Sequence, residues 1–178
     1  MNSHEMIYQK ATKLIEKYKT RDPVEIIEAL HIMIAPTDTS KLLGMYTIFQ
    51  RKRIILISER AGKLKNTVLA HELGHDQLHR NECHAGKAFT ENSLLFSNGR
   101  CELEANIFAA HLLIGNEEIK SLLNDGYTIQ EIACTLGVTK ELVSLKISEM
   151  NTLNLLNIEN WKLYEMSSNH LKNYIPKD

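Results

Sequence analysis

Two histidines four positions apart, His71 and His75, constrain this chain more than any other feature, because they can act together only on a helix. Residues at this spacing on an α-helix project from one face, about one turn apart, so both imidazole rings can reach the same ion. Apolar residues at helical spacing around them independently predict a helix from Leu64 to His79. The segment therefore indicates a metal-binding helix and not a surface helix that carries two unrelated histidines.

Glu72 stands directly after the first histidine and completes the pattern HExxH. A carboxylate at this position can act as general base on a water molecule whose pKa is lowered by the metal, and zinc is the metal typical of this pattern. Gly74 allows another segment to approach the helix closely. We therefore expect Zn²⁺ bound by His71 and His75, with Glu72 as the catalytic base.

A catalytic zinc ion needs a third protein ligand. His79 lies roughly 12 Å along the helix axis from His71, too far to share the ion, so we expect it to support a ligand or to pack. A second predicted helix, Arg100 to Leu113, offers Glu102 and Glu104, which project about 200° apart, so only one can face the metal. We predict Glu104, because it shares a face with small and apolar residues.

The pairing of AHELGH with ELEANIFAAHLLI resembles the ImmA/IrrE family of metallo-endopeptidases, which carry a HExxH helix followed by an ExEANxFA helix. The likeness covers roughly residues 25–150. It implies zinc ligation by His71, His75 and Glu104, with Glu72 as the base. Members typically lie beside a helix-turn-helix repressor in phages and other mobile elements, and they relieve repression by cleaving or otherwise inactivating it. The resemblance thus implies a protein substrate of that class.

Two further residues are candidates for stabilising the oxyanion that forms when water attacks a peptide carbonyl. Many family members have Glu then LLMP where this chain has His111 followed by LLIG. His111 lies about 10 Å beyond Glu104 along the helix, so it is either an oxyanion donor or a hydrogen-bonded buried histidine. Tyr46, which precedes the zinc helix, is the second candidate.

The expected fold class is α+β, with a small antiparallel sheet packed on a zincin-like helical core. Two β-rich runs, Met45 to Phe49 and Arg53 to Ile57, predict a hairpin, and Ile32 to Ala35 can add a third strand. Helices are predicted for residues 5–19 and, opened by Asp22 and Pro23, for the segment that follows.

Three parts are predicted along the chain: a metallopeptidase domain over residues 1–115, a helix-turn-helix-like unit over 116–150, and a tail over 151–178. Within the first part, residues 80–99 are polar and contain glycine, so we expect a long loop near the site.

The helix-turn-helix-like unit consists of two predicted helices around a glycine turn between Thr128 and Met150. Recognition of DNA would need cationic or amide side chains on the second helix, which offers Lys140 and Lys146 against Glu141 and Glu149. We therefore expect this unit to pack or to dock a protein substrate, and we do not expect direct DNA binding.

Global composition gives no reason to expect nucleic acid or membrane partners, since 21 basic residues balance 22 acidic ones. Neither a signal peptide nor an apolar run of membrane-spanning length is visible, which predicts a cytoplasmic location. Three cysteines without a CxxC pair predict reduced thiols.

Two functions remain open from the sequence. The first is a zinc-dependent endopeptidase that cleaves or inactivates a regulatory protein, in particular a helix-turn-helix repressor. The alternative is a non-proteolytic, zinc-containing binding module that modulates a repressor or DNA. The intact Glu72 favours the enzyme, because a purely structural zinc site needs no general base beside its first ligand.

Overall fold

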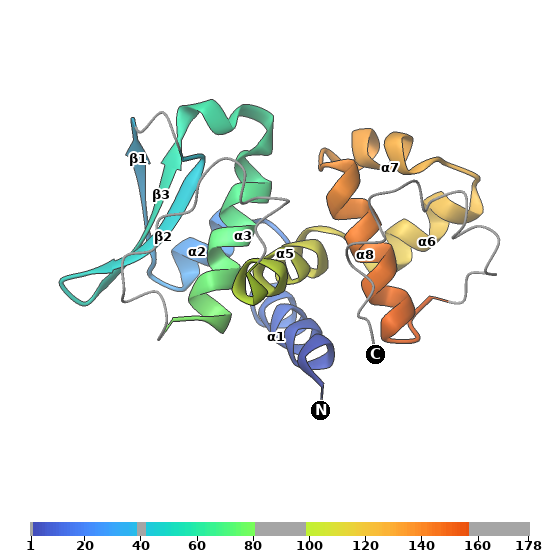
Figure 1. Cartoon of the computed structure of the whole chain (residues 1–178), viewed down its shortest axis with the longest axis horizontal. Helices are drawn as coiled ribbons and strands as arrows, with labels where there is room; N and C mark the ends of the chain where they lie inside the picture. Colours follow the sequence, from blue (N-terminus) through green and yellow to red (C-terminus); the bar gives the residue numbers. More distant parts are fainter. Residues whose placement is uncertain (1, 39–41, 81–98, 157–178) are drawn as a thin grey trace. The chain divides into compact units, whose positions relative to one another are not determined.

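The computed structural model describes residues 2–38, 42–80 and 99–156, and these form two compact units, Met1–Leu113 and Ile114–Asp178. The described residues have the predicted α+β composition, with seven α-helices and one three-stranded sheet (Figure 1). The zincin-like character of the core and the separate tail from residue 151 stay predictions. Most of the predicted loop over residues 80–99 lies outside the described residues.

The first unit begins with two helices and continues through the sheet to a helical pair. Its helices are α1 (Ser3–Tyr18), α2 (Pro23–Ala29), α3 (Lys65–Leu78) and α5 (Arg100–Leu113). Its strands are β1 (Met33–Thr37), β2 (Gly44–Phe49) and β3 (Lys52–Ser58), and a 3-10 helix, η1 (Glu59–Leu64), leads into α3. As predicted, Asp22 caps α2 by accepting a hydrogen bond from the Val24 amide, and Pro23 takes the first helical position.

The sheet has the strand order β1-β3-β2. Strands β2 and β3 form the predicted antiparallel hairpin, in which Phe49 pairs with Lys52 across Gln50 and Arg51, both in the left-handed region with φ of 48° and 64°. Strand β1, however, pairs with β3 in parallel. The prediction of a wholly antiparallel sheet was therefore wrong for β1, because β3 inserts between the two earlier strands and apolar patterning carries no information on strand direction.

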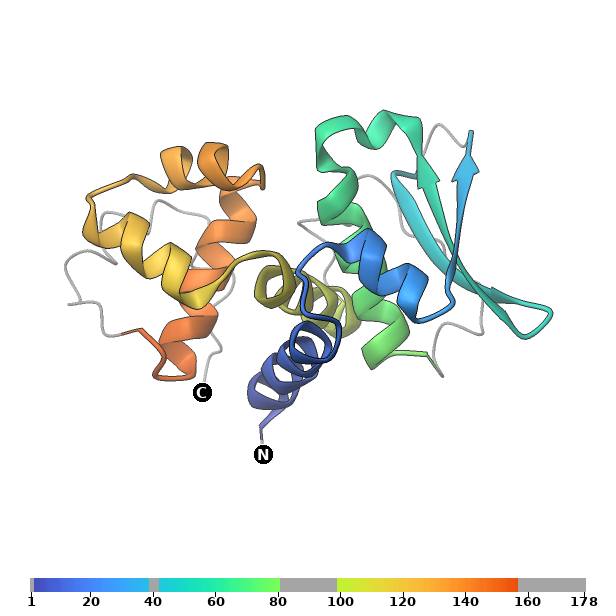
Figure 2. The ribbon, with the colours of Figure 1, turned by 180° about the vertical axis from the view of Figure 1, so that it is seen from behind.

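Helix α3 contacts the two hairpin strands as well as α2 and α5, and α1 packs beside α5 (Figures 1 and 2). The contact between α3 and α5 is close at Gly74, where an added Cβ would lie 3.1 Å from the Cα of Ala105. This is the close approach that Gly74 led us to expect. It leaves most of α3, from Thr67 to Asp76, buried, so polar side chains on this helix lie within the protein interior.

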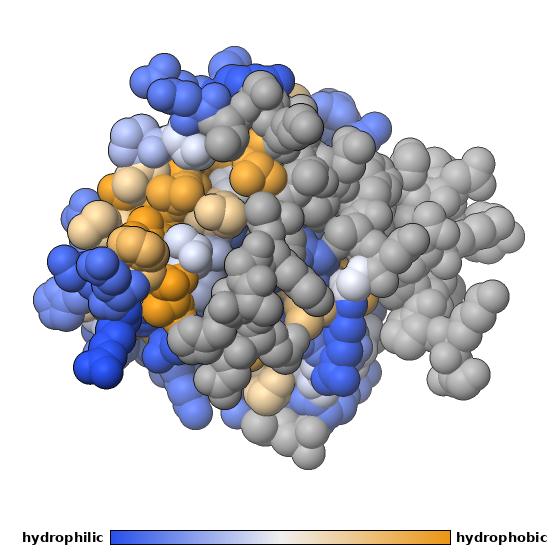
Figure 3. Space-filling view, turned by 60° about the vertical axis from the view of Figure 1, so that its left-hand side comes forward, coloured by the Kyte–Doolittle hydropathy of each residue, from blue (hydrophilic) through white to orange (hydrophobic). Residues whose placement is uncertain are grey.

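One face of the sheet remains partly exposed. Tyr46, Ile55 and Ile57 are buried, whereas Met33 and Phe49 are 50% and 63% exposed. Figure 3, in which the side carrying the sheet comes forward, shows apolar side chains gathered on this part of the surface.

The second unit contains α6 (Asn116–Asn124), α7 (Ile129–Leu136) and α8 (Lys140–Thr152). A capping box between Thr128 and Glu131 begins α7, Gly137 ends it with φ of 64°, and Thr139 caps α8. The predicted helices and glycine turn are therefore present. Whether the unit is a true helix-turn-helix stays a prediction.

Two charged residues of α8 occupy a different environment from the one expected. Lys146 and Glu149, which were counted as part of a charged helix surface, are only 1% and 4% exposed. The Lys146 ammonium donates a hydrogen bond to Asn116 Oδ1 at 2.7 Å. Lys146 is thus a structural residue of the second unit, and it offers no charge to a DNA backbone.

Within the described residues, no helix combines the length and the apolar character that crossing a membrane requires.

Candidate metal centre

Three buried side chains from α3 and α5 converge in the first unit: His71, His75 and Glu102. The Nε2 atoms of the two histidines lie 3.1 Å apart. One carboxylate oxygen of Glu102 lies 3.3 Å from His71 Nε2, and the other lies 3.5 Å from His75 Nε2. All three candidate ligand atoms are within 4.8 Å of one another. They form a cluster compatible with a single metal ion.

The hydrogen bonds around the cluster also fit a cation. The Nδ1–H of His71 donates to Asn106 Oδ1 at 2.8 Å, because an amide oxygen can only accept, and this leaves the Nε2 lone pair facing the cluster. Neither oxygen of Glu102 receives a hydrogen bond from the described residues, although both are buried. Acceptors buried together without donors are costly unless a cation lies between them, so these residues fit a metal ion.

The charge states of Glu102 and His75 support the same conclusion. Burial would raise the pKa of Glu102, but its contacts with the two histidines hold that pKa at about 2. Burial lowers the pKa of His75 to about 4. Burial also acts to lower the pKa of His71, yet the neighbouring Glu102 and Glu72 carboxylates raise it on balance. At neutral pH Glu102 is therefore an anion and His75 is neutral, the forms that bind metals, whereas the raised pKa of His71 means that a metal ion would compete with a proton at that residue.

The structure corrects the choice of Glu104 as the third ligand. Glu104 Oε2 lies 2.9 Å from His79 Nε2, and its Oε1 accepts hydrogen bonds from Arg100 and Ser3, each at 2.8 Å. These contacts direct its carboxylate toward the end of α3 and toward α1, away from the converging ligand atoms. Glu102 takes the position that we had assigned to Glu104.

The error came from the choice of helix face. Gly74 contacts Ala105, so the stripe of α5 that packs on α3 runs through Ala105 and Ala109. At 100° per residue, Glu102 is only about 20° from Ala109 around the helix, whereas Glu104 is about 140° away. The small residues Ala105 and Ala109 indicated the face of α5 that contacts α3, whereas the apolar Phe108, which lies near Glu104, did not.

Glu72 lies beside the cluster and is itself buried. Its Oε2 accepts a hydrogen bond from the backbone amide of Tyr46 in β2 at 2.7 Å, and burial raises its pKa to about 7. Gly44 at the start of β2 makes room for it, since an added Cβ would lie 3.1 Å from Glu72 Oε1 and 2.4 Å from Val68 Cγ1. Sequence reasoning missed Gly44, although an isolated glycine at the edge of a predicted strand often signals close approach.

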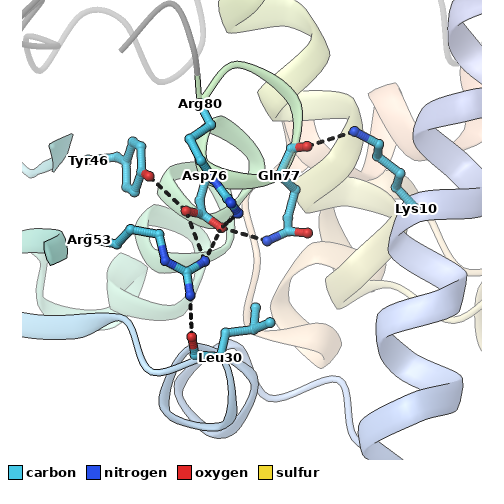
Figure 4. A network of polar contacts seen from close by, with 7 residues as sticks. All are labelled: Lys10, Leu30, Tyr46, Arg53, Asp76, Gln77 and Arg80. Carbon is cyan, nitrogen blue, oxygen red and sulfur yellow. Dashed lines mark hydrogen bonds and ion pairs between the residues drawn. The ribbon is translucent and has the colours of Figure 1, made fainter. Parts of the chain in front are cut away.

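The Tyr46 side chain does not suit the oxyanion role considered for it. Its ring is buried, and its hydroxyl donates to the buried Asp76 carboxylate at 2.7 Å (Figure 4). Burial and this hydrogen bond both raise the pKa of Tyr46. Arg53, Gln77 and Arg80 also donate to Asp76. Tyr46 therefore belongs to a structural network that joins the hairpin to α3.

His111 is likewise not brought to the cluster. It follows Glu102 by nine residues, which places it about 13 Å further along α5. Its buried ring packs edge-on against Tyr8 of α1, with 5.0 Å between the ring centroids. Its backbone carbonyl accepts a hydrogen bond from Arg21 at 3.0 Å. These contacts join α5 to α1 and to the segment between α1 and α2, and the oxyanion role stays a prediction without support from this geometry.

A helix with two histidines and an adjacent glutamate, completed by a carboxylate from a second helix, defines a site of the metallopeptidase class. The chain belongs to the Peptidase_M78 family, whose IrrE N-terminal-like domain matches residues 28–148. A curated relative, "Uncharacterized immunity region protein 2" of Bacillus phage phi105, is 34% identical over 148 residues, which are 82% of this chain and 92% of the phage protein. These similarities confirm the resemblance to ImmA/IrrE proteins of the mobile-element type.

Proposed function

We propose that this protein is a zinc-dependent endopeptidase that cleaves or otherwise inactivates a regulatory protein, in particular a helix-turn-helix transcriptional repressor. The observation that carries the proposal is the convergence of three buried groups, His71, His75 and Glu102, with the buried Glu72 directly after His71 on α3.

His71 and His75 would hold zinc through their Nε2 atoms, and Glu102 would hold it through its carboxylate. Two imidazoles and one carboxylate are the protein ligands of many catalytic zinc sites, and they leave a coordination position open. Zinc supplies a Lewis acid that polarises the scissile carbonyl and acidifies water. Asn106 keeps His71 in the required orientation through its hydrogen bond to Nδ1.

Glu72 would take a proton from the attacking water and later deliver it to the departing amine. In the metal-free site burial raises the pKa of Glu72 to about 7, and a raised pKa strengthens a carboxylate as a proton acceptor. The Tyr46 amide fixes one carboxylate oxygen, so the position of the base is set by the backbone of β2.

The nature of the substrate is inferred from the relatives. The phage phi105 protein is named for an immunity region, a context of gene regulation. A repressor substrate would place the reaction in the cytoplasm. Because Lys146 is buried, α8 offers few cations to DNA, which favours a role in packing or in docking the protein substrate.

The test starts with the metal content of the full chain, followed by incubation of the zinc-loaded protein with the repressor encoded beside its gene. Mass spectrometry should detect two new fragments from one peptide bond. The matched control is Glu72→Gln, which should retain zinc and produce no fragments. Stable binding of the repressor without cleavage, by a zinc-loaded wild type, would contradict the enzyme and support the non-proteolytic alternative.

A further inference from the structure

Three side chains form a line that leads away from the candidate metal ligands: His75, His79 and Glu104. His75 Nδ1 lies 3.3 Å from His79 Nδ1, and His79 Nε2 lies 2.9 Å from Glu104 Oε2. We propose that His79 and Glu104 are positioning residues that hold His75 in the tautomer able to bind a metal through Nε2. This inference rests on the metal site of the proposed function and assigns a role to two residues outside it.

The order of donors along the line follows from its last member. A carboxylate only accepts hydrogen bonds, so His79 must carry its proton on Nε2. In neutral His79 the Nδ1 atom then bears a lone pair and accepts from the Nδ1–H of His75. A neutral His75 with its proton on Nδ1 has a lone pair on Nε2, the atom that faces His71 and Glu102. The proton position on His79 therefore determines the proton position on His75. The series ends at Nε2 of His75, the atom that would bind the metal.

The far end of the line is firmly held. Glu104 Oε1 accepts hydrogen bonds from Ser3 at the start of α1 and from Arg100 at the start of α5, so its Oε2 remains directed at His79. His79 is itself buried and directly follows the last residue of α3. The carboxylate is thus held by a residue of α1 and by a residue of its own helix, α5, in addition to its contact with His79.

The other histidine of the cluster, His71, is held in the same tautomer by a single acceptor. His71 Nδ1 donates directly to Asn106 Oδ1, and its Nε2 faces the cluster. Both histidines therefore present Nε2 and use Nδ1 as a donor. A metal-binding histidine commonly donates its other ring N–H to an acceptor, which fixes the tautomer and increases the basicity of the ligand.

The variants His79→Phe and Glu104→Leu remove the two acceptors in turn, and Glu104→Gln retains an oxygen that can accept from His79. Glu117→Gln is the matched control, since it neutralises an exposed carboxylate that pairs with Lys120 on α6. Long-range ¹H–¹⁵N NMR on the metal-free full chain reports which nitrogen of His75 carries the proton. Competition with a chromogenic chelator measures the affinity for zinc chloride, and thermal unfolding checks that each variant is folded.

We expect wild-type His75 to carry its proton on Nδ1 and both His79→Phe and Glu104→Leu to lose that preference. Zinc affinity should fall about 10–100-fold in these two variants, the range typical when the support of a ligand is removed. Glu104→Gln should remain closer to wild type than Glu104→Leu, and Glu117→Gln should match wild type.

An unchanged His75 tautomer and zinc affinity in folded Glu104→Leu would overturn the inference, and this variant decides alone if His79→Phe does not fold. The tautomer is measured without metal and without substrate. A protein that shows the expected tautomer and zinc affinities but cleaves nothing would therefore contradict the peptidase function and leave the positioning role supported.

Discussion

Two carboxylates buried in the first unit meet opposite environments. The Asp76 side chain is 0% exposed and accepts hydrogen bonds from four side chains, those of Tyr46, Arg53, Gln77 and Arg80 (Figure 4). The Glu102 side chain is 7% exposed and faces two histidines, yet it receives no hydrogen bond from the described residues. Arg53 and Arg80 supply positive charge to Asp76, whereas the surroundings of Glu102 are compatible with a metal ion.

The contrast arises from neighbouring positions on one helix. Asp76 follows His75 directly, and successive residues on a helix point about 100° apart. His75 therefore faces α5 and the cluster, while Asp76 faces the hairpin. Arg53 of β3 also donates to the backbone carbonyl of Leu30, and Lys10 of α1 donates to that of Gln77 at 2.7 Å, so the Asp76 network joins several elements (Figure 4). One face of α3 thus carries the hydrogen-bonded network of Asp76, and the adjacent face carries the candidate metal ligands His71 and His75.

The largest expected effect comes from a change at Glu72, which leaves Asp76 and Glu102 intact. Glu72→Gln keeps the shape of the side chain but cannot accept a proton from water. Cleavage of the cognate repressor should fall roughly 10²–10⁴-fold, the usual contribution of a general base, and zinc content should be unchanged. Cleavage near the wild-type rate would show that another group is the base.

The second prediction tests whether Glu102 binds the metal ion. Glu102→Ala should lower zinc affinity by more than the roughly 10–100-fold expected for a residue that only supports a ligand. The metal-free protein should remain folded, because the loss of the contacts with the two histidines is offset by the removal of a buried carboxylate that receives no hydrogen bond from the described residues. Chelator competition and thermal unfolding measure the two quantities. A larger loss of zinc affinity in Glu104→Ala than in Glu102→Ala would restore the original assignment.

Asp76→Asn should have the opposite profile. It removes the charge that Arg53 and Arg80 face, so the free energy of unfolding should fall by about 2 kcal/mol, a value reduced because both arginines are partly exposed. Zinc affinity should stay near the wild-type value, since His75 keeps its contact with His79. Urea unfolding gives the first quantity and chelator competition the second. A variant with unchanged stability and weakened zinc binding would show that Asp76 supports the metal site and would contradict the distinction between Asp76 and Glu102.

The sequence predicted those parts of the fold that depend on local chemistry. Asp22 with Pro23, the glycine turn after α7 and the HExxH spacing each specify their structure within a few neighbouring residues. The predictions that were wrong concern contacts between residues that are distant in sequence. The parallel pairing of β1 and the choice between Glu102 and Glu104 are decided by which segment packs opposite. Gly44 and Asn106 could not be assigned to the site before the packing of β2 and α5 against α3 was known.

The smallest effect extends the comparison to the second unit, where Lys146 is a buried charge that contacts Asn116, and Lys140 on the same helix is exposed. Lys140→Glu should leave the stability and zinc content unchanged, since the side chain lies at the surface. It should impair cleavage of the repressor if α8 docks that protein. Lys146→Met should instead lower the unfolding temperature, because it leaves Asn116 without this donor.

Neither variant should alter binding to duplex DNA, which we expect to be no tighter than the roughly 10⁻⁴ to 10⁻⁶ M of non-specific binders at physiological salt. Fluorescence anisotropy with a labelled duplex at several salt concentrations measures this affinity. Submicromolar binding with a steep salt dependence, lost in Lys140→Glu while repressor cleavage is retained, would identify α8 as a DNA-binding element. Since Lys146 is buried, Lys140 is the cation that α8 can offer to such a duplex, and any further cations would have to come from other elements.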